Sequence, residues 1–160
     1  MNRTVRAATA ALLRGPARHA LGPFITRFDR VLFHVSDGRW KLSAPLIPSL
    51  MLFTIGAKSG IRRETPLMCF PQPDGSWFVG ASNWGLEKHP GWSANLLANP
   101  DAEVHYRRKL IAVRATLLNQ AEADALWPEL EEQWPHYRGY EKTAKRSIRV
   151  FRLAPGPTEN

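Results

Sequence analysis

The spacing between strand-like runs limits the fold of this chain more than any other feature of its sequence. "SLMLFTI" (49–55), "RRETPLMCF" (62–70) and "SWFVGAS" (76–82) are β-rich, and only short turn segments such as "GAKSG" and "PQPDG" separate them. Turns this short join antiparallel neighbours, because a parallel crossover needs a dozen or more residues. The first part of the core is therefore predicted to be a meander and not a βαβ unit.

The rest of the chain continues as short strands with small helices between them. Segments 102–107 and 110–118 predict a hairpin across Arg108 and Lys109, and 147–153 predicts a last strand. About six strands, mostly joined by short turns, favour a compact antiparallel barrel with helical additions. The predicted fold class is therefore mainly β.

Several residues mark the predicted helix boundaries. Pro90 suits the first residue of a helix, because its missing N–H is not needed there. Asn119 and Glu122 have the spacing of a capping box. Pro128 is expected to break the helix that follows into two pieces, and a further short helix is predicted over 136–145.

Charge and composition divide the chain into a basic helical segment (1–35), a barrel domain (36–153) and a disordered tail (154–160). The formal net charge is +8, and the first thirty residues hold six arginines but one acid. Such an excess favours anionic partners: nucleic acid, a membrane surface or a polyanionic small molecule.

The N-terminal segment carries no convincing signal peptide and no stretch long enough to span a bilayer. Phe24, Phe28 and Val31 predict one apolar helix face, which could cover the core or lie on a membrane surface. A single cysteine, Cys69, agrees with a reducing compartment. We expect a cytoplasmic protein with possible peripheral membrane association.

Several common catalytic motifs are absent. "GAKSG" is similar to part of a P-loop, but Leu52 occupies the position of the first glycine. No dinucleotide-binding glycine motif follows a strand, and no nucleophile elbow is present. The histidines lack metal-ligand spacing, so no metal site is predicted.

Four stretches, in this order and spacing, resemble the deazaflavin-dependent nitroreductase family, which uses coenzyme F420 and includes F420H2-dependent quinone reductases. They are "FTIGAKSGIRRETPLM", "WFVGASNWGLEKHPGW", "NLLANP" and "WPELEEQWPHYRGYE". The resemblance covers about residues 49–153. It implies a split β-barrel that binds the cofactor in a groove, as a monomer or homodimer.

The resemblance also implies which residues bind the cofactor. They are Ala57, Lys58, Ser59, Arg63, Glu64, Thr65, Pro66, Leu67, Met68, Gly80, Ala81, Ser82, Asn83, Gly91, Trp92, Ser93, Ala94, Asn95 and Tyr137. Coenzyme F420 carries a phosphate and an oligoglutamate tail, so its site needs cations, and Lys58, Arg62 and Arg63 surround the turn at 56–60. For Trp92, packing in the core beside Leu96 is an equal alternative. His89 is expected at the surface.

Substrate contact and proton donation are assigned by the same resemblance to Ser82 and to an aromatic series. Trp134, Tyr137 and Tyr140 lie three residues apart, which places them along one face of the last helical piece. Tyr137 is the leading candidate for proton donation, and a packing role is its alternative.

This sequence departs from the family pattern at three positions. Ala57 stands where many relatives have Arg, and Met68 and Trp134 stand where prodrug-activating nitroreductases have tyrosines. The expected reaction is hydride transfer from reduced F420 to a planar hydrophobic acceptor. Quinones or activated enones are favoured over bicyclic nitroimidazoles.

Three alternatives remain from the sequence. The chain could be a non-catalytic split-barrel protein that binds a cofactor or lipid. It could use FMN, although a single phosphate needs fewer cations. Its charge and six tryptophans could also mark a nucleic-acid or membrane binder, but our prediction is a small-molecule enzyme without nucleic acid.

Overall fold

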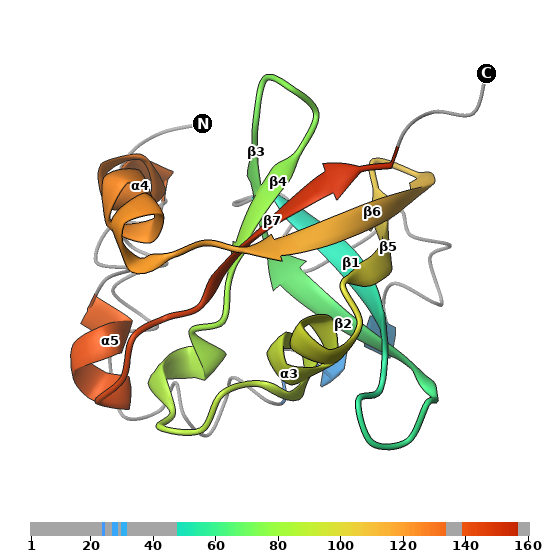
Figure 1. Cartoon of the computed structure of the whole chain (residues 1–160), viewed down its shortest axis with the longest axis horizontal. Coiled ribbons are helices and arrows are strands. Elements are labelled where there is room, and N and C mark those ends of the chain that lie inside the picture. Colours follow the sequence, from blue (N-terminus) through green and yellow to red (C-terminus); the bar gives the residue numbers. More distant parts are fainter. Residues whose placement is uncertain (1–23, 25–26, 29, 32–47, 134–138, 157–160) are drawn as a thin grey trace.

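One curled antiparallel sheet forms the body of the protein (Figure 1). The computed structural model describes residues 24, 27–28, 30–31, 48–133 and 139–156. The strands are β1 (Ser49–Ile55), β2 (Arg62–Met68), β3 (Phe70–Pro71), β4 (Trp77–Gly80), β5 (Asp101–Tyr106), β6 (Lys109–Leu117) and β7 (Val150–Pro155). Their order is β2-β1-β5-β6-β7-β4-β3, and every neighbouring pair is antiparallel. The predicted split-barrel class, mainly β with helical additions, is confirmed.

The meander expected for the first strands is confirmed in its pairings, because the segment predicted over 62–70 pairs antiparallel with β1 through β2 and with β4 through β3. β2 and β3 nevertheless lie at the two ends of the strand order. β1 pairs with β2 and β5, whereas β4 pairs with β3 and β7. Residues 50–53 are all buried, so β1 is covered on both faces and lies inside the sheet. The strand predicted over 62–70 is interrupted at Cys69, whose N–H donates to the carbonyl of Pro48 at 2.9 Å.

The hairpin between β5 and β6 turns one residue earlier than predicted. Arg107 and Arg108 have φ values of 46° and 69°, and Lys109 already belongs to β6. Two successive positive φ values are typical of the two-residue turn whose twist matches that of a hairpin. The existence of this hairpin is confirmed and its turn position is corrected.

Between residues 48 and 156 the described helices are η1 (Asn83–Gly85), α3 (Gly91–Ala98), α4 (Gln120–Gln133) and α5 (Gly139–Ala144). The capping box is confirmed, because Asn119 N–H donates to Glu122 Oε2 at 2.8 Å and Glu122 N–H donates to Asn119 Oδ1 at 2.9 Å. The predicted break at Pro128 is wrong, since α4 continues through it. Trp127 and Leu130, only 2% and 1% exposed, hold the helix to the core around the proline. This packing offsets a proline penalty of about 3 kcal/mol.

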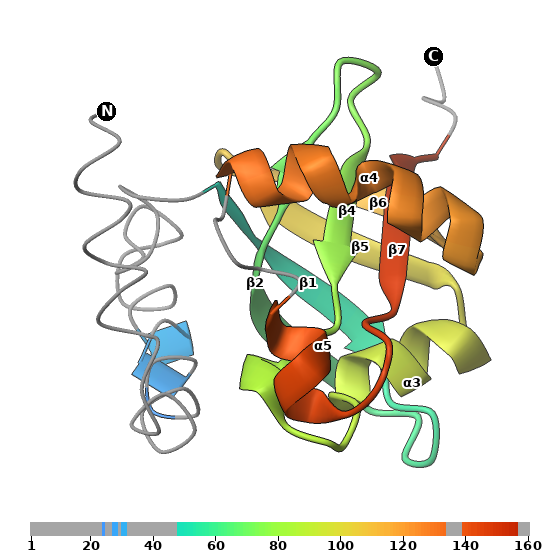
Figure 2. The same ribbon diagram turned by 90° about the vertical axis from the view of Figure 1, so that its left-hand side faces the viewer.

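The helices cover opposite ends of the sheet. Figure 2 shows α4 lying across the strands at one end, whereas η1, α3, α5 and the β1–β2 turn gather at the other end. Pro90 precedes α3 and does not begin it, because Gly91 is its first residue. Within the described part of the chain, no helix is long and apolar enough to cross a membrane.

The core of the described residues consists of two apolar clusters and a separate pair, Met51 with Phe53. The larger one includes Leu50, Leu52, Val104, Phe151 and Leu153, contributed by β1, β5 and β7, together with Trp92 and Leu96 of α3. The smaller one joins Phe70, Trp127, Leu130, Tyr140 and Ile148, and so attaches α4 and α5 to the sheet. α3 therefore belongs to the main core, whereas α5 belongs to the smaller cluster.

The β3–β4 turn provides a pH test of the fold. Ser76 donates to Asp74 Oδ1 from both its hydroxyl (2.6 Å) and its N–H (2.9 Å), and Arg152 donates to Asp74 Oδ2. The Ser76 hydrogen bonds, followed by Arg152, lower the pKa of Asp74 from 3.8 to about 2. Because the folded pKa is depressed, this stabilisation is complete above the unfolded pKa and is lost as pH falls toward 2.

We therefore expect Asp74→Asn to lower the melting temperature at neutral pH. The difference from the unmodified protein should shrink as pH falls from about 4 to about 2, since the wild-type carboxyl is then protonated. Thermal unfolding, followed by circular dichroism at each pH in this range, measures the difference in melting temperature between the two proteins. A difference that stayed constant with pH would show that the Asp74 charge does not contribute.

Candidate active site

Three of the predicted cofactor-binding segments meet at one end of the sheet. They are the β1–β2 turn, the segment from Gly80 through η1 to His89, and the first turns of α3 (Figure 1). Asn95 joins two of them: its Oδ1 accepts the N–H of Ala57 at 3.0 Å, and its Nδ2 donates to Thr54 Oγ1 at 2.9 Å. The structure therefore brings the β1–β2 turn against α3, as the predicted site requires.

The β1–β2 turn holds itself together by local hydrogen bonds. Gly60 N–H donates to Gly56 O at 2.8 Å, and Gly60 has a φ of 65°, a conformation that side chains disfavour. Ser59 Oγ accepts the N–H of Ile61 at 3.3 Å, so this hydroxyl supports the turn. Lys58 is exposed and has no ion-pair partner within the described ranges.

Residues 63–68 of β2 do not share one face. Arg63 lies opposite the buried Thr54, and Thr65 lies opposite Leu52 in the main core. Glu64 lies opposite Phe53 on the other face, and its carboxylate Oε1 lies 3.6 Å from Arg30 Nε. Because side chains alternate along a strand, Arg63, Thr65 and Leu67 share one face while Glu64, Pro66 and Met68 share the other. One ligand can meet the side chains of only half of this run.

The Arg62 side chain lies on the face of β2 opposite the one that carries Arg63. It forms an ion pair with Glu103 at 2.6 Å, and its guanidinium lies 3.9 Å from the centre of the Phe53 ring. The sequence grouped Arg62 with Lys58 and Arg63 around the turn. In the structure, Arg62 already has a counter-ion, whereas Arg63 has none within the described residues.

The segment that contains η1 has an unusual backbone. Asn83, Trp84 and Gly85 have successive φ values of 49°, 58° and 80°. Asn83 Nδ2 donates to the carbonyl of Lys88 at 2.7 Å and closes the loop on itself. Positive φ in non-glycine residues is costly and concentrates at functional sites, which fits the predicted role of this segment in ligand contact.

Two arginines missed as site residues support this segment and α3. Arg146 donates to backbone carbonyls of the loop, including those of Ala81 at 3.1 Å and Ser82 at 3.2 Å. Arg149 Nη1 donates to Ser93 Oγ at 3.5 Å, and its carbonyl accepts the N–H of Ala81. The sequence showed both only as part of a basic C-terminal segment. No local motif indicated that they fold back onto residues more than fifty positions earlier.

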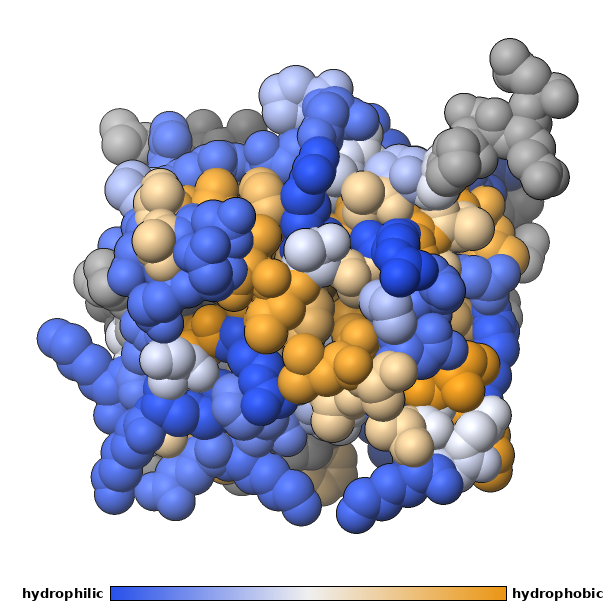
Figure 3. Space-filling view, in the orientation of Figure 1, coloured by the Kyte–Doolittle hydropathy of each residue, from blue (hydrophilic) through white to orange (hydrophobic). Residues whose placement is uncertain are grey.

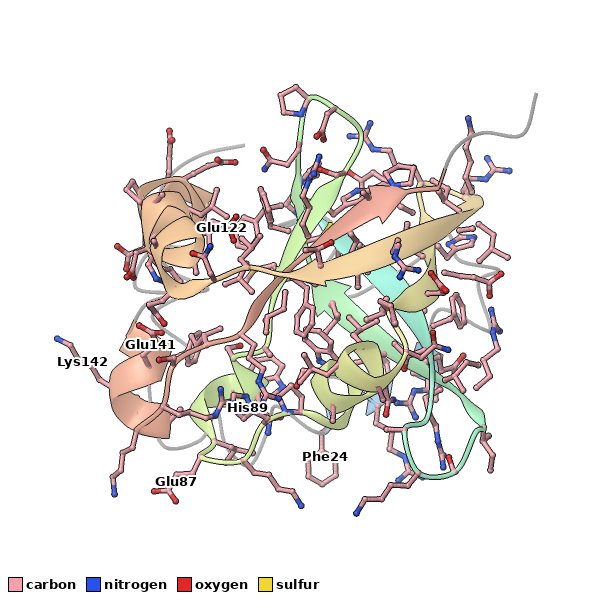
Figure 4. The ribbon with its side chains drawn as sticks, in the orientation of Figure 1. Phe24, Glu87, His89, Glu122, Glu141 and Lys142 are labelled. Atoms are coloured by element: carbon pink, nitrogen blue, oxygen red, sulfur yellow. The ribbon has the colours of Figure 1, made fainter. Side chains whose placement is uncertain are left out.

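His89 is half-buried and not a surface residue as expected. Figure 4 shows it between the η1 loop and α3, whereas Glu87 points outward. Burial, and then the charges of Arg146 and Arg149, lower its pKa from 6.5. Its Nδ1 is buried without a hydrogen-bond partner among the described residues. His89 thus brings an imidazole with an unused ring nitrogen to the site.

The residues of α3 divide between core and surface. Trp92 is 6% exposed, and its ring centre lies 5.7 Å from that of Phe151, so its position is that of a core anchor. Ser93 is fully buried, whereas Gly91 and Ala94 are exposed. Contact of Trp92 with a cofactor stays a prediction.

Of the aromatic series Trp134, Tyr137 and Tyr140, only Tyr140 lies among the described residues. It is 9% exposed and packs in the smaller core cluster, and a Cβ added at Gly85 would lie 3.1 Å from its ring. This position supports η1 from behind. Trp134 and Tyr137 lie outside the described residues, so their roles stay predictions.

The combined arrangement suits a polar, anionic ligand with a planar part. Figure 3 shows a hydrophilic surface over α5 and the η1 loop, next to an apolar area over β6 and β7. The exposed Lys58 and Arg63 provide positive charge without a described counter-ion. The buried Nδ1 of His89 provides an unused hydrogen-bonding atom. These features fit a cofactor with a phosphate and an acidic tail.

Comparisons with known proteins agree with one another on the family that this chain resembles. A family model described as F420H(2)-dependent quinone reductase matches residues 26–155. An F420H(2)-dependent quinone reductase of Mycobacterium tuberculosis is 31% identical over 140 residues, which cover 85% of this chain and 93% of the relative.

Two solved structures extend the likeness to the fold. One is an F420-H2 dependent reductase with a TM-score of 0.59 and 34% identity, covering 66% of this chain and 93% of that chain. The other is described as a domain-swapped dimer, with a TM-score of 0.62 and 32% identity, covering 79% of this chain and 93% of that chain. Both share their overall architecture with the curled sheet described above.

Proposed function

The chain belongs to the F420H(2)-dependent quinone reductase family, and from this premise we propose that its hydride acceptor is a quinone. It is an oxidoreductase whose cofactor is coenzyme F420. The observation that carries the proposal is the meeting of the β1–β2 turn with α3 through Asn95, beside two cations without described counter-ions.

The residues of this site would hold the cofactor in distinct ways. Lys58 and Arg63 would bind its acidic groups, each charge-assisted hydrogen bond contributing about 1.5–3 kcal/mol before screening by solvent. The backbone of Ser82 and Asn83 would face the polar edge of the ring. When bound in its reduced form, F420 supplies a hydride at a ring carbon. The protein then has to position the acceptor and exclude water.

A quinone is preferred to a nitroaromatic acceptor because of the residues that differ from nitroreductases. Met68 is partly buried against the smaller core cluster, where a tyrosine hydroxyl is expected in prodrug-activating relatives. Ser82 remains as a half-buried hydroxyl beside the predicted ring position and could donate to a quinone oxygen. Proton donation by Ser82 or Tyr137 is part of this proposal.

A quinone dissolved in a membrane is the acceptor we favour. Phe24, Phe28 and Val31, spaced four and three residues apart, are 72%, 55% and 54% exposed. Arg27 is exposed on the same helical stretch. An exposed apolar face with nearby arginine is the pattern of a helix that lies in a membrane interface. The protein would then act as a peripheral enzyme at an anionic membrane surface.

We expect purified protein to oxidise reduced F420 with a long-tailed quinone carried in anionic vesicles and with a short-tailed, water-soluble quinone. Phe24→Ser with Phe28→Ser should lower the rate several-fold with the vesicle quinone alone, because only that reaction needs the apolar face. Absorbance of F420 measures both rates. Equal loss with both quinones would contradict the membrane proposal.

The same assay tests whether the protein is an F420-dependent quinone reductase at all. Tight F420 binding without oxidation by any quinone would favour a non-catalytic binding protein. Preferential binding of FMN in parallel titrations would contradict the use of F420.

A further inference from the structure

The guanidinium of Arg146 contacts the backbone carbonyls of several residues in the η1 loop. Its Nε donates to Glu87 O at 2.9 Å and to Leu86 O at 3.2 Å. Its Nη2 lies 3.1 Å from Ala81 O, 3.2 Å from Ser82 O and 3.5 Å from Lys88 O. Nη1 donates to the carbonyl of Ser147 at 3.2 Å, which ties the guanidinium to its own segment. One side chain thus gathers the carbonyls from both ends of the loop.

We propose that Arg146 is a positioning residue for cofactor binding, and this rests on the proposed function. By drawing the loop carbonyls toward its guanidinium, Arg146 turns the N–H groups of the same peptide units the other way. The C=O and N–H of a trans peptide point in opposite directions, so the carbonyls of Ala81 and Ser82 fix the directions of Ser82 N–H and Asn83 N–H.

The two amides oriented in this way are available to a ligand. Neither Ser82 N–H nor Asn83 N–H has an acceptor within the described part of the chain. Both belong to the segment for which ring contact is proposed. Arg146 would therefore act through the backbone and would not itself touch the cofactor.

The backbone of the loop explains why such a support is needed. Asn83 and Trp84 have φ values of 49° and 58°, and left-handed conformations of this kind cost roughly 1–2 kcal/mol per non-glycine residue. Within the loop, Gly85 N–H donates to Ser82 O at 2.9 Å, Leu86 N–H donates to Asn83 O at 3.0 Å, and the Asn83 side chain donates to Lys88 O at 2.7 Å. Charge-assisted hydrogen bonds from a guanidinium can offset this strain.

Arginine suits this task better than lysine. Its planar group presents five N–H donors in a fixed fork, whereas a lysine ammonium has three donors around one atom. The acceptors here divide between Nε and Nη2, so a single ammonium cannot reach both sets in the same geometry. Arg146→Lys keeps the charge and removes the fork, which separates positioning from electrostatic attraction.

The test compares wild type and Arg146→Lys by fluorescence titration with F420 and by amide hydrogen exchange of the peptide covering residues 81–90 without ligand. We expect affinity to fall about 10-fold or more, because small displacements of positioning groups cost one to two orders of magnitude. We also expect faster exchange in the loop. Arg114→Lys is the matched control, since Arg114 pairs with Asp101 at the surface, and it should change neither readout.

Each outcome decides between explanations. Unchanged affinity in Arg146→Lys, with or without faster loop exchange, overturns the proposal. Absence of F420 binding by wild type would contradict the proposed function and this inference with it, even if loop exchange changed. If Arg146→Lys does not fold, Arg146→Ala is titrated with added guanidinium, which should restore binding if the fork is what matters; failure to restore it would overturn the proposal.

Discussion

Replacing Lys58 and Arg63 together by alanine is expected to weaken F420 binding by about 100-fold, because two charge-assisted contacts are lost and each factor of ten corresponds to about 1.4 kcal/mol. Both side chains are exposed, and neither has a described counter-ion. Their removal should therefore leave the fold intact. Fluorescence titration gives the affinity, and thermal unfolding gives the stability.

Arg62→Ala is the matched control for this variant. Arg62 is adjacent to Arg63 in sequence but lies on the opposite face of β2, where it pairs with Glu103 and covers Phe53. Its loss should reduce stability slightly and leave F420 affinity within a factor of about three, because a solvent-exposed ion pair contributes little. If Arg62→Ala and Arg63→Ala weaken binding equally, the assignment of the ligand to one face of β2 is wrong.

Local features of this fold were predictable because their signals are local. The run at 49–55 predicted β1 with its observed bounds, and Asn119 with Glu122 predicted a helix start that the structure confirms. The pairing of β1 with β5 and of β4 with β7 was not predictable in this way. It depends on contacts between distant segments, for which short turns give no information.

The same division applies to the site. Segments that carry family motifs were predicted from sequence, and the structure brings the β1–β2 turn and α3 together. The alternation of residues 63–68 between two faces follows from strand geometry and could have been applied to the predicted list. Arg146 and the half-buried His89 could not have been found, since their contacts join segments far apart in the chain.

Asn95 offers the second large test, because it links the β1–β2 turn to α3. Asn95→Ala removes the acceptor of Ala57 N–H and the hydrogen-bond partner of the Thr54 hydroxyl. Thr54 is a buried residue, only 2% exposed. A buried hydroxyl left without a partner costs about 1–3 kcal/mol. We expect a loss of stability in that range, measured by urea unfolding, together with weaker F420 binding because the turn is no longer held against the helix.

Asn95→Asp separates the link from the charge. An aspartate can accept the N–H of Ala57 and a hydrogen bond donated by the Thr54 hydroxyl, so both contacts are kept and stability should change little. The added negative charge would repel an acidic cofactor tail. We expect F420 affinity about 10-fold below wild type at low ionic strength, and a difference that narrows as salt screens the repulsion.

Asn99→Asp provides the matched control for this charge. Asn99 lies at the other end of α3, and its side chain accepts the N–H of Asp101 at 3.1 Å, a bond that an aspartate can also accept. The same charge placed there should leave F420 affinity close to wild type. If the two aspartate variants bind F420 equally well, the anionic part of the cofactor does not lie near the β1–β2 turn, and the cations Lys58 and Arg63 would need another role.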